Sequence, residues 1–308
     1  MVTGINLSKE ETARLDTDEF MRKVCHGCIV GNQQRNVAKP HPGSELAITE
    51  ELALIHMDVC GPIEPTSMGG NRYIATFLDD YTNYSVVRLI KVKSQVPEEI
   101  KSVIAELERQ TGLQVKAIRS DRGGEYINQT LQDYLKKKGT VQQLTAPYSP
   151  EQNGKAERLN RTLVERVRSM LHSSHVSKNL WAEAVVTANC IRNCSPTTDH
   201  TKTPWELFYN VKPDVSNMRI FGSIAYVHTP KELRKKLDPN EKLCIFLGYE
   251  SHAKAYRVLV DGKVKISKNV VVYETEDHME QDIPPDVLPT ATSQTLHHRR
   301  NSDGSVEE

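Results

Sequence analysis

Apolar residues alternate with more polar ones along residues 52–60, which is the pattern of a strand with one buried face. Asp58 falls on the side of this strand opposite its main apolar positions. Two further apolar, β-branched runs follow at residues 73–78 and 85–92, with the turn-forming segment 79–83 between them. Because consecutive strands joined by short turns usually pair with each other, we predict a three-stranded meander.

The next part of the chain changes from strand periodicity to helix periodicity and back. Apolar residues at three- and four-residue steps predict a helix that starts at Pro97 and stops before Gly112. A shorter helix is predicted over residues 128–138, and strands are predicted at residues 115–118 and 141–144. The meander therefore continues with an alternation of strands and helices.

A longer helix follows the turn-forming segment 147–154. Its apolar residues share one face: Ala156, Leu159, Leu163, Val167, Met170 and Leu171. Its predicted polar face carries Glu157, Asn160, Arg161 and Arg168. On an arbitrary helix such a mixture of charges is most often a solvated salt-bridge surface. The predicted order is βββαβαβα, with Asp58 in the first strand, Asp121 at the end of the fourth and Glu157 on the last helix.

The chain beyond this helix is rich in short strands. A helix over residues 180–191 and a helical turn from Thr203 come first. Strands are then predicted at 220–227, 243–249, 255–260 and 264–273. Asp261-Gly262 predicts a tight turn, and the spacing favours a small barrel-like module. Residues 275–308 lack apolar periodicity and are expected to be disordered.

Composition narrows the class of protein. The chain has 308 residues, enough for one large or two modest domains, and 40 basic residues balance 40 acidic ones, which excludes a strongly basic binding module. The segment from Lys155 to Arg168, however, contains five basic and two acidic residues. The electrostatic field near a protein surface depends on such local charge. No long apolar stretch or signal sequence is present, so we expect a soluble intracellular protein without a membrane partner.

Cysteine usage points to a metal-binding knuckle instead of a disulfide scaffold. Cys25 and Cys28 have the CxxC spacing that holds zinc, among six cysteines in the whole chain. A structural zinc site needs four ligands. His26 lies inside the knuckle and His41 at an unfavourable distance from it, so the site is incomplete and zinc binding is not favoured.

Three carboxylates are candidates for a second metal centre. Asp58 and Asp121 occupy adjacent strand positions in the predicted sheet, and Glu157 comes from a nearby helix. Such oxygen clusters bind two Mg²⁺ ions about 3.5 to 4 Å apart for in-line phosphoryl transfer. Either aspartate alone would more often be a structural acid, so the joint pattern carries the interpretation.

Several motifs resemble those of a known family. These are HMDVCGPI at 56–63, FLDDYTNY at 77–84, RSDRGGEY at 119–126 and PYSPEQNGKAERLNRTL at 147–163. Thirty-five residues separate Asp121 from Glu157. With this DD35E spacing, the sequence resembles the integrase of Ty1/copia-type LTR retrotransposons, within the retroviral integrase and DDE transposase superfamily. The resemblance covers roughly residues 25–275.

The resemblance implies a fold and a set of domains. The fold would be α/β, an RNase H-like core with a five-stranded mixed sheet flanked by helices, followed by a small β-rich, SH3-like module. The implied segments are a partial zinc-binding segment and linker over 1–45, a catalytic core over 46–195, the β-rich module over 196–275 and a disordered tail over 276–308.

The resemblance also implies an activity. The protein would be a DDE polynucleotidyl transferase that trims 3′ ends of element DNA and joins them to target DNA. Asp58, Asp121 and Glu157 would hold two Mg²⁺ or Mn²⁺ ions. Double-stranded DNA, a second copy of the chain and a nuclear site of action are implied, with no small-molecule substrate. The implied DNA contacts are Gln152, Asn153, Gly154, Lys155, Arg158 and Arg161, while Tyr148 would either stack near the DNA end or pack in the core.

The sequence departs from the family pattern at its start. The family's zinc module is HHCC, and the two histidines expected before Cys25 are absent. Motifs of a protease, reverse transcriptase or RNase H region are absent too, so we expect an integrase portion of a longer polyprotein or a degraded element. Two alternatives stay open: an RNase H-like nuclease without strand transfer, and a catalytically idle DNA-binding remnant.

Overall fold

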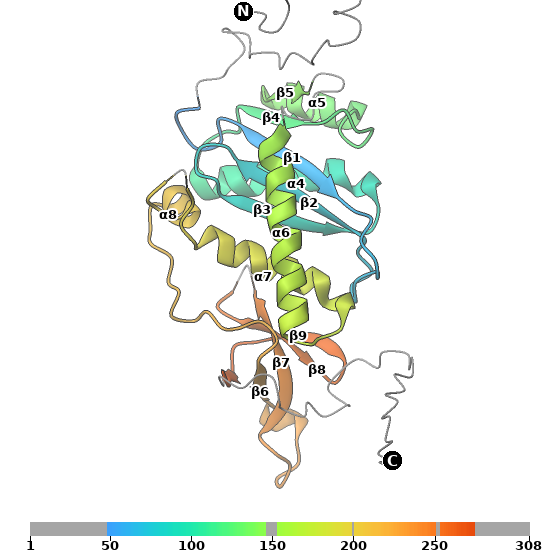
Figure 1. Ribbon diagram of the computed structural model, residues 1–308, viewed down its shortest axis with the longest axis vertical. Helices are drawn as coiled ribbons and strands as arrows, with labels where there is room; N and C mark the ends of the chain where they lie inside the picture. Colours follow the sequence, from blue (N-terminus) through green and yellow to red (C-terminus); the bar gives the residue numbers. More distant parts are fainter. Residues whose placement is uncertain (1–47, 146–152, 199, 251–252, 275–308) are drawn as a thin grey trace, which may run out of the picture. The chain divides into compact units, whose positions relative to one another are not determined.

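The computed structural model describes residues 48–145, 153–198, 200–250 and 253–274 (Figure 1). The predictions for Cys25, Cys28, Tyr148 and Gln152, and for the tail beyond residue 274, fall outside these residues and stay predictions. Within the described ranges, no helix combines the length and the apolar character that crossing a bilayer requires.

A five-stranded mixed sheet forms the first part of the described chain (Figure 1). Its strands, in sheet order, are β3 (Ser85–Ile90), β2 (Tyr73–Asp79), β1 (Ile55–Cys60), β4 (Ala117–Ser120) and β5 (Val141–Leu144). The first three pair in antiparallel fashion, whereas β4 pairs in parallel with β1 and β5 in parallel with β4. The predicted meander and the predicted order βββαβαβα are confirmed.

Helices cover both faces of this sheet because the strands bury apolar side chains on both sides. The helices are α4 (Val96–Thr111), α5 (Gln129–Lys138), α6 (Gly154–Ser173) and α7 (Trp181–Asn193). Met57 and Phe77 share one apolar cluster with α4, while Ile74 and Leu78 share another with α6 and α7. Gly112, with φ of 75°, ends α4 where the sequence predicts. Short 3₁₀ turns lie at Lys93–Gln95, Lys178–Leu180 and Lys231–Leu233.

The C-terminal part contains α8 (Pro204–Tyr209) and a second, wholly antiparallel five-stranded sheet. Its strands, in sheet order, are β10 (Val270–Val272), β6 (Ile224–His228), β7 (Glu241–Tyr249), β8 (Tyr256–Val260) and β9 (Lys263–Ser267). The predicted single strand at 264–273 was wrong, since its first half pairs with β8 and its second half with β6. The predicted turn at Asp261-Gly262 is confirmed, with φ of 51° and 69°.

The second sheet packs on α7 through a close backbone approach at Gly248. The Thr187 hydroxyl donates a hydrogen bond of 2.7 Å to the carbonyl of Leu247. A Cβ at Gly248 would lie 2.0 Å from Thr187 Oγ1, and Gly248 has φ of 142°. Only glycine fits there without moving the helix or the strand.

We therefore expect Gly248→Ala to lower the free energy of unfolding by about 3 kcal/mol, because the added methyl group overpacks a buried contact and strains the backbone. Gly262→Ala is the matched control. It shares a positive φ but meets no atom within 4 Å, so its loss is expected near 1 kcal/mol. Urea denaturation of the two variants measures the difference, and equal losses would contradict the close approach.

Candidate active site

Parallel pairing of β1 with β4 brings two aspartates to one edge of the sheet. Ile55 pairs with Ile118 and His56 with Arg119. Two residues further along the same register come Asp58 and Asp121. Burial raises the pKa of Asp58, and the negative charge of Asp121 raises it further, while hydrogen bonds from the Val59 amide and from Asn160 act in the opposite direction. The two carboxylates are thus close enough to repel each other.

Helix α6 is fixed to β1 at two points on one of its faces. The Asn153 side chain, at the start of α6, donates a hydrogen bond of 2.9 Å to the carbonyl of Met57. About two turns further along the helix, Asn160 Nδ2 donates a hydrogen bond of 2.8 Å to Asp58 Oδ2. Glu157 follows Asn153 by four positions and precedes Asn160 by three, so it lies on the same helix face, with an exposed side chain.

The chemistry of these donors suits a hard divalent cation, because carboxylate oxygens are the ligands that Mg²⁺ and Mn²⁺ prefer. The mutual repulsion of Asp58 and Asp121 also favours a cation beside them. The geometry is only partly assembled: among the described residues, no three His, Cys, Asp or Glu side chains converge into a group that would hold a metal ion. The structure thus brings the two aspartates together and does not bring Glu157 into a closed cluster with them.

A lysine and a glutamate missed in the sequence flank the aspartates. Lys93 Nζ lies 2.8 Å from Glu125 Oε1, and the positive charge of Lys93 lowers the pKa of Asp58. Gly123 N donates to Asp121 Oδ1 at 2.9 Å, and a Cβ on this glycine would lie 2.8 Å from the Glu125 carboxyl group. Gly123, the first of the two glycines of the RSDRGGEY motif, therefore leaves room for the carboxylates of Asp121 and Glu125.

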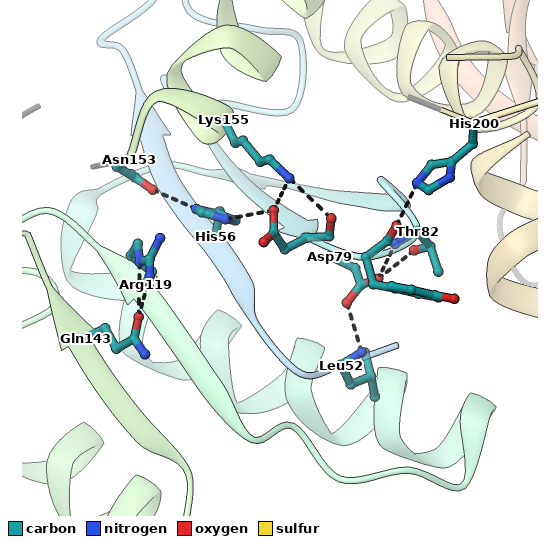
Figure 2. Close-up of polar contacts among 11 residues, drawn as sticks. Leu52, His56, Asp79, Thr82, Arg119, Gln143, Asn153, Lys155 and His200 are labelled. Carbon is teal, nitrogen blue, oxygen red and sulfur yellow. Dashed lines mark hydrogen bonds and ion pairs between the residues drawn. The ribbon is translucent and has the colours of Figure 1, made fainter. Parts of the chain in front are cut away.

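Lys155, expected to contact DNA, instead forms an ion pair with the buried Asp80 (Figure 2). Asp80 Oδ1 also lies 3.3 Å from His56 Nε2, and His56 Nδ1 lies 3.4 Å from Asn153 Oδ1. Burial opposes ionisation of Asp80, but the hydrogen bonds and charges of His56 and Lys155 prevail and lower its pKa to about 2. This polar network, which we call the His56 network, joins β1, the turn after β2 and the first turn of α6.

The lowered pKa of Asp80 predicts a pH-dependent contribution to stability. Because the unfolded chain binds this proton more tightly, the contribution is complete above the ordinary pKa of 3.8 and is lost as the pH falls through about 2. Asp80→Asn should therefore lower the free energy of unfolding by about 2 kcal/mol at pH 7 and by much less near pH 2. Urea titrations across this range measure it, with the exposed Asp133→Asn as control. A loss that is the same at both pH values would contradict the ion-pair account.

The other aspartate of the FLDDYTNY motif is structural. Asp79 is buried, and its carboxylate accepts hydrogen bonds from the amides of Leu52 and Thr82, each at 2.8 Å (Figure 2). The Thr82 hydroxyl donates a third bond of 2.6 Å. Asp79 therefore fixes the turn between β2 and β3, whereas Asp80, through Lys155, helps to fix the position of α6.

The other residues that the sequence places at the start or on the polar face of this helix differ in their exposure. Gly154 begins α6, and Arg158 and Arg161 are exposed on it. Asn160, assigned in the sequence to a solvated polar face, is buried at 7% exposure. Its position three residues after Glu157 in the motif was the one available signal for its role beside Asp58.

Comparisons with known proteins match two segments of the chain. The family described as integrase core domain matches residues 49–150, and the family described as retroviral polymerase SH3-like domain matches residues 223–286. The first match contains β1 through β5, and the second contains the second sheet.

Curated relatives extend the similarity. The retrovirus-related Pol polyprotein from transposon TNT 1-94 of Nicotiana tabacum is 40% identical over 257 residues, which are 82% of this chain and 19% of that protein. The corresponding polyprotein from transposon RE1 of Arabidopsis thaliana is 30% identical over 237 residues, 76% of this chain and 16% of the relative. The chain thus spans less than a fifth of the length of either relative.

Among solved structures, a chain of the simian T-cell lymphotropic virus intasome in complex with PP2A regulatory subunit B56 gamma has a TM-score of 0.48 and 17% identity, covering 82% of this chain and 88% of that one. The two domain matches and the identity with plant Pol polyproteins carry the assignment. The chain belongs to the integrase family of Ty1/copia-type LTR retrotransposons.

Proposed function

We propose that this chain is the integrase portion of a retrotransposon Pol polyprotein, a DDE polynucleotidyl transferase that processes the 3′ ends of element DNA and joins them to target DNA. The observation that supports this most is the meeting of Asp58 with Asp121 at the sheet edge, where Asn160 of α6 contacts Asp58. Three separate motifs of the sequence converge at this edge.

In this proposal Asp58, Asp121 and Glu157 hold divalent metal, Mg²⁺ or Mn²⁺, as a pair of ions. The metal would activate the attacking oxygen and stabilise the leaving oxygen of an in-line displacement. No side chain needs to act as a nucleophile. Asn160 orients the Asp58 carboxylate, and Lys93 partly offsets the charge of the aspartates until metal binds.

The substrates in this proposal are double-stranded element ends and target DNA in the nucleus, bound by an oligomer of the chain. Exposed Arg158 and Arg161 on α6 would contact phosphates with little sequence preference. Gln152 and Gly154 would lie beside the scissile phosphate, whereas the buried Asn153 side chain stays bonded to the Met57 carbonyl. The His56 network would hold the first turn of α6, and with it Glu157, against β1.

A strand-transfer assay tests the proposal. The chain is incubated with Mg²⁺, pre-cut element-end DNA and a target duplex, and the products are separated on a denaturing gel. Joined product longer than the donor strand is expected. Shortened strands without joined product would favour the nuclease alternative. DNA binding with neither product would favour the idle remnant, and either outcome would overturn the proposal.

A further inference from the structure

A small hollow of about 150 Å³ opens on the side of α6 turned away from Asp58. Its α6 lining includes Lys155, Arg158 and Thr162, which recur at steps of three and four and so share one helix face. Asn160, which contacts Asp58, is separated from Thr162 by about 200° of helix rotation, so the hollow is distinct from the carboxylate site. From α7 and the segment after it come Arg192, Thr197 and Thr198.

The hollow has an excess of positive charge. Three of its lining residues are cations, and no carboxylate lies among the described residues that line it. Asp80 pairs with Lys155, whereas Arg158 and Arg192 have no ion pair with any carboxylate that the structure describes. Among the described residues, the Arg192 guanidinium donates to two neutral oxygens, the carbonyl of Asn83 at 2.8 Å and the Ser85 hydroxyl at 3.0 Å.

This charge is costly to hold without an anion. Burial lowers the pKa of Arg192 to about 10, and the nearby positive charge of Arg166 acts in the same direction. A cation that is largely buried, and that has no carboxylate partner within the described part of the chain, destabilises a fold unless a ligand supplies the opposite charge. The cost suggests that the cations are retained for binding.

An unsatisfied hydroxyl is a second, independent observation. Thr197 Oγ1 is buried and has no hydrogen-bond partner among the described residues. Buried polar atoms are nearly always paired, so an orphaned donor in the wall of a basic hollow calls for an acceptor there. Guanidinium groups and a hydroxyl together form the donor set that recognises a tetrahedral oxyanion.

We propose that this hollow binds a phosphate group of a nucleic-acid backbone. Its volume is below the roughly 300 to 1,000 Å³ of pockets for drug-sized ligands and suits a single phosphate. The choice of nucleic acid over free phosphate rests on the proposed function, since α6 would then hold DNA on this side and act on it at the Glu157 side. Binding here supplies affinity without base recognition.

Adding a negative charge at Thr162 tests the site. Thr162→Glu places a carboxylate in the hollow. Thr162→Gln introduces a side chain of the same shape as glutamate but without the charge. Ser169→Glu adds the same charge on the same helix face two turns away, outside the lining. Fluorescence anisotropy with a labelled DNA duplex in EDTA should show about tenfold weaker binding for Thr162→Glu than for either control, with a salt-dependence slope lower by about 0.9. Equal affinities of Thr162→Glu and Thr162→Gln, or equal weakening by Ser169→Glu, would overturn the site.

Thermal unfolding serves two purposes. It checks that the variants fold, and it distinguishes a site for free phosphate from a site for nucleic-acid phosphate. Thr162→Glu should unfold at or above the wild-type temperature, because it neutralises the cations, so weaker binding would not reflect misfolding. If inorganic phosphate raises the melting temperature of Thr162→Gln but not of Thr162→Glu, while both bind DNA equally, a free-anion site replaces the nucleic-acid one. Since these readouts need no metal, an inactive protein in the strand-transfer assay leaves them unchanged, and the two proposals fail separately.

Discussion

Replacing Asp121 by asparagine is expected to lower the rate of strand transfer at least about 10³-fold, or roughly 4 kcal/mol of barrier. Asparagine keeps the shape of the side chain and can still accept the hydrogen bond from the Gly123 amide. What it removes is one of the two charges that meet at the sheet edge and favour a divalent cation. Metal-dependent chemistry should fail while the fold persists.

DNA affinity separates this outcome from a general loss of structure. In EDTA, Asp121→Asn and Glu157→Gln should both bind a DNA duplex within about twofold of wild type, because neither side chain is a phosphate contact. Glu125→Gln is the matched control: it neutralises a carboxylate beside Asp121 that pairs with Lys93, and should keep activity within about tenfold. Loss of DNA binding in Asp121→Asn, or an equal loss of activity in Glu125→Gln, would contradict the roles assigned to these acids.

The parts of the site that depend on local periodicity could be predicted from the sequence. Alternation along 52–60 places Asp58 on the strand face opposite Met57, and the structure has Met57 in the α4 cluster and Asp58 toward α6. Because the strand period decides which side chains share a face, the face of β1 that carries Asp58 followed from the pattern, whereas its meeting with Asp121 also requires β1 to pair with β4.

The parts that depend on distant partners could not be predicted. The family resemblance implied a DNA contact for Lys155, but its partner in the structure, Asp80, lies 75 positions earlier, and no periodicity links the two residues. Likewise, a run of β-branched residues at 264–273 has the same pattern whether it forms one strand or two. Which neighbour each half pairs with is decided by the sheet, since β9 adds to β8 and β10 to β6.

The place of Asn160 on its helix follows from local periodicity, but its partner Asp58 is distant in the sequence. Substituting Asn160 gives the second large effect that we expect on strand transfer. Its amide donates to Asp58 Oδ2 at 2.8 Å from a largely buried position. Asn160→Asp is nearly isosteric but replaces this donor with a carboxylate oxygen, so two negative groups would face each other at hydrogen-bond distance. Either they share a proton or Asp58 turns away, and both outcomes disturb the orientation of a metal ligand. We expect strand transfer to fall about 10²-fold to 10³-fold.

A neutral counterpart distinguishes orientation from charge. Asn160→Leu, of similar volume, removes the donor without adding a carboxylate, and should reduce strand transfer about tenfold while keeping the melting temperature within a few degrees. Single-turnover rates of both variants at fixed Mg²⁺ give the comparison, with circular dichroism as the check on folding. If Asn160→Asp retains wild-type activity, the hydrogen bond to Asp58 does not position the carboxylate. If both variants lose activity equally, the donor alone matters, because the added charge then has no effect of its own on the pair of aspartates.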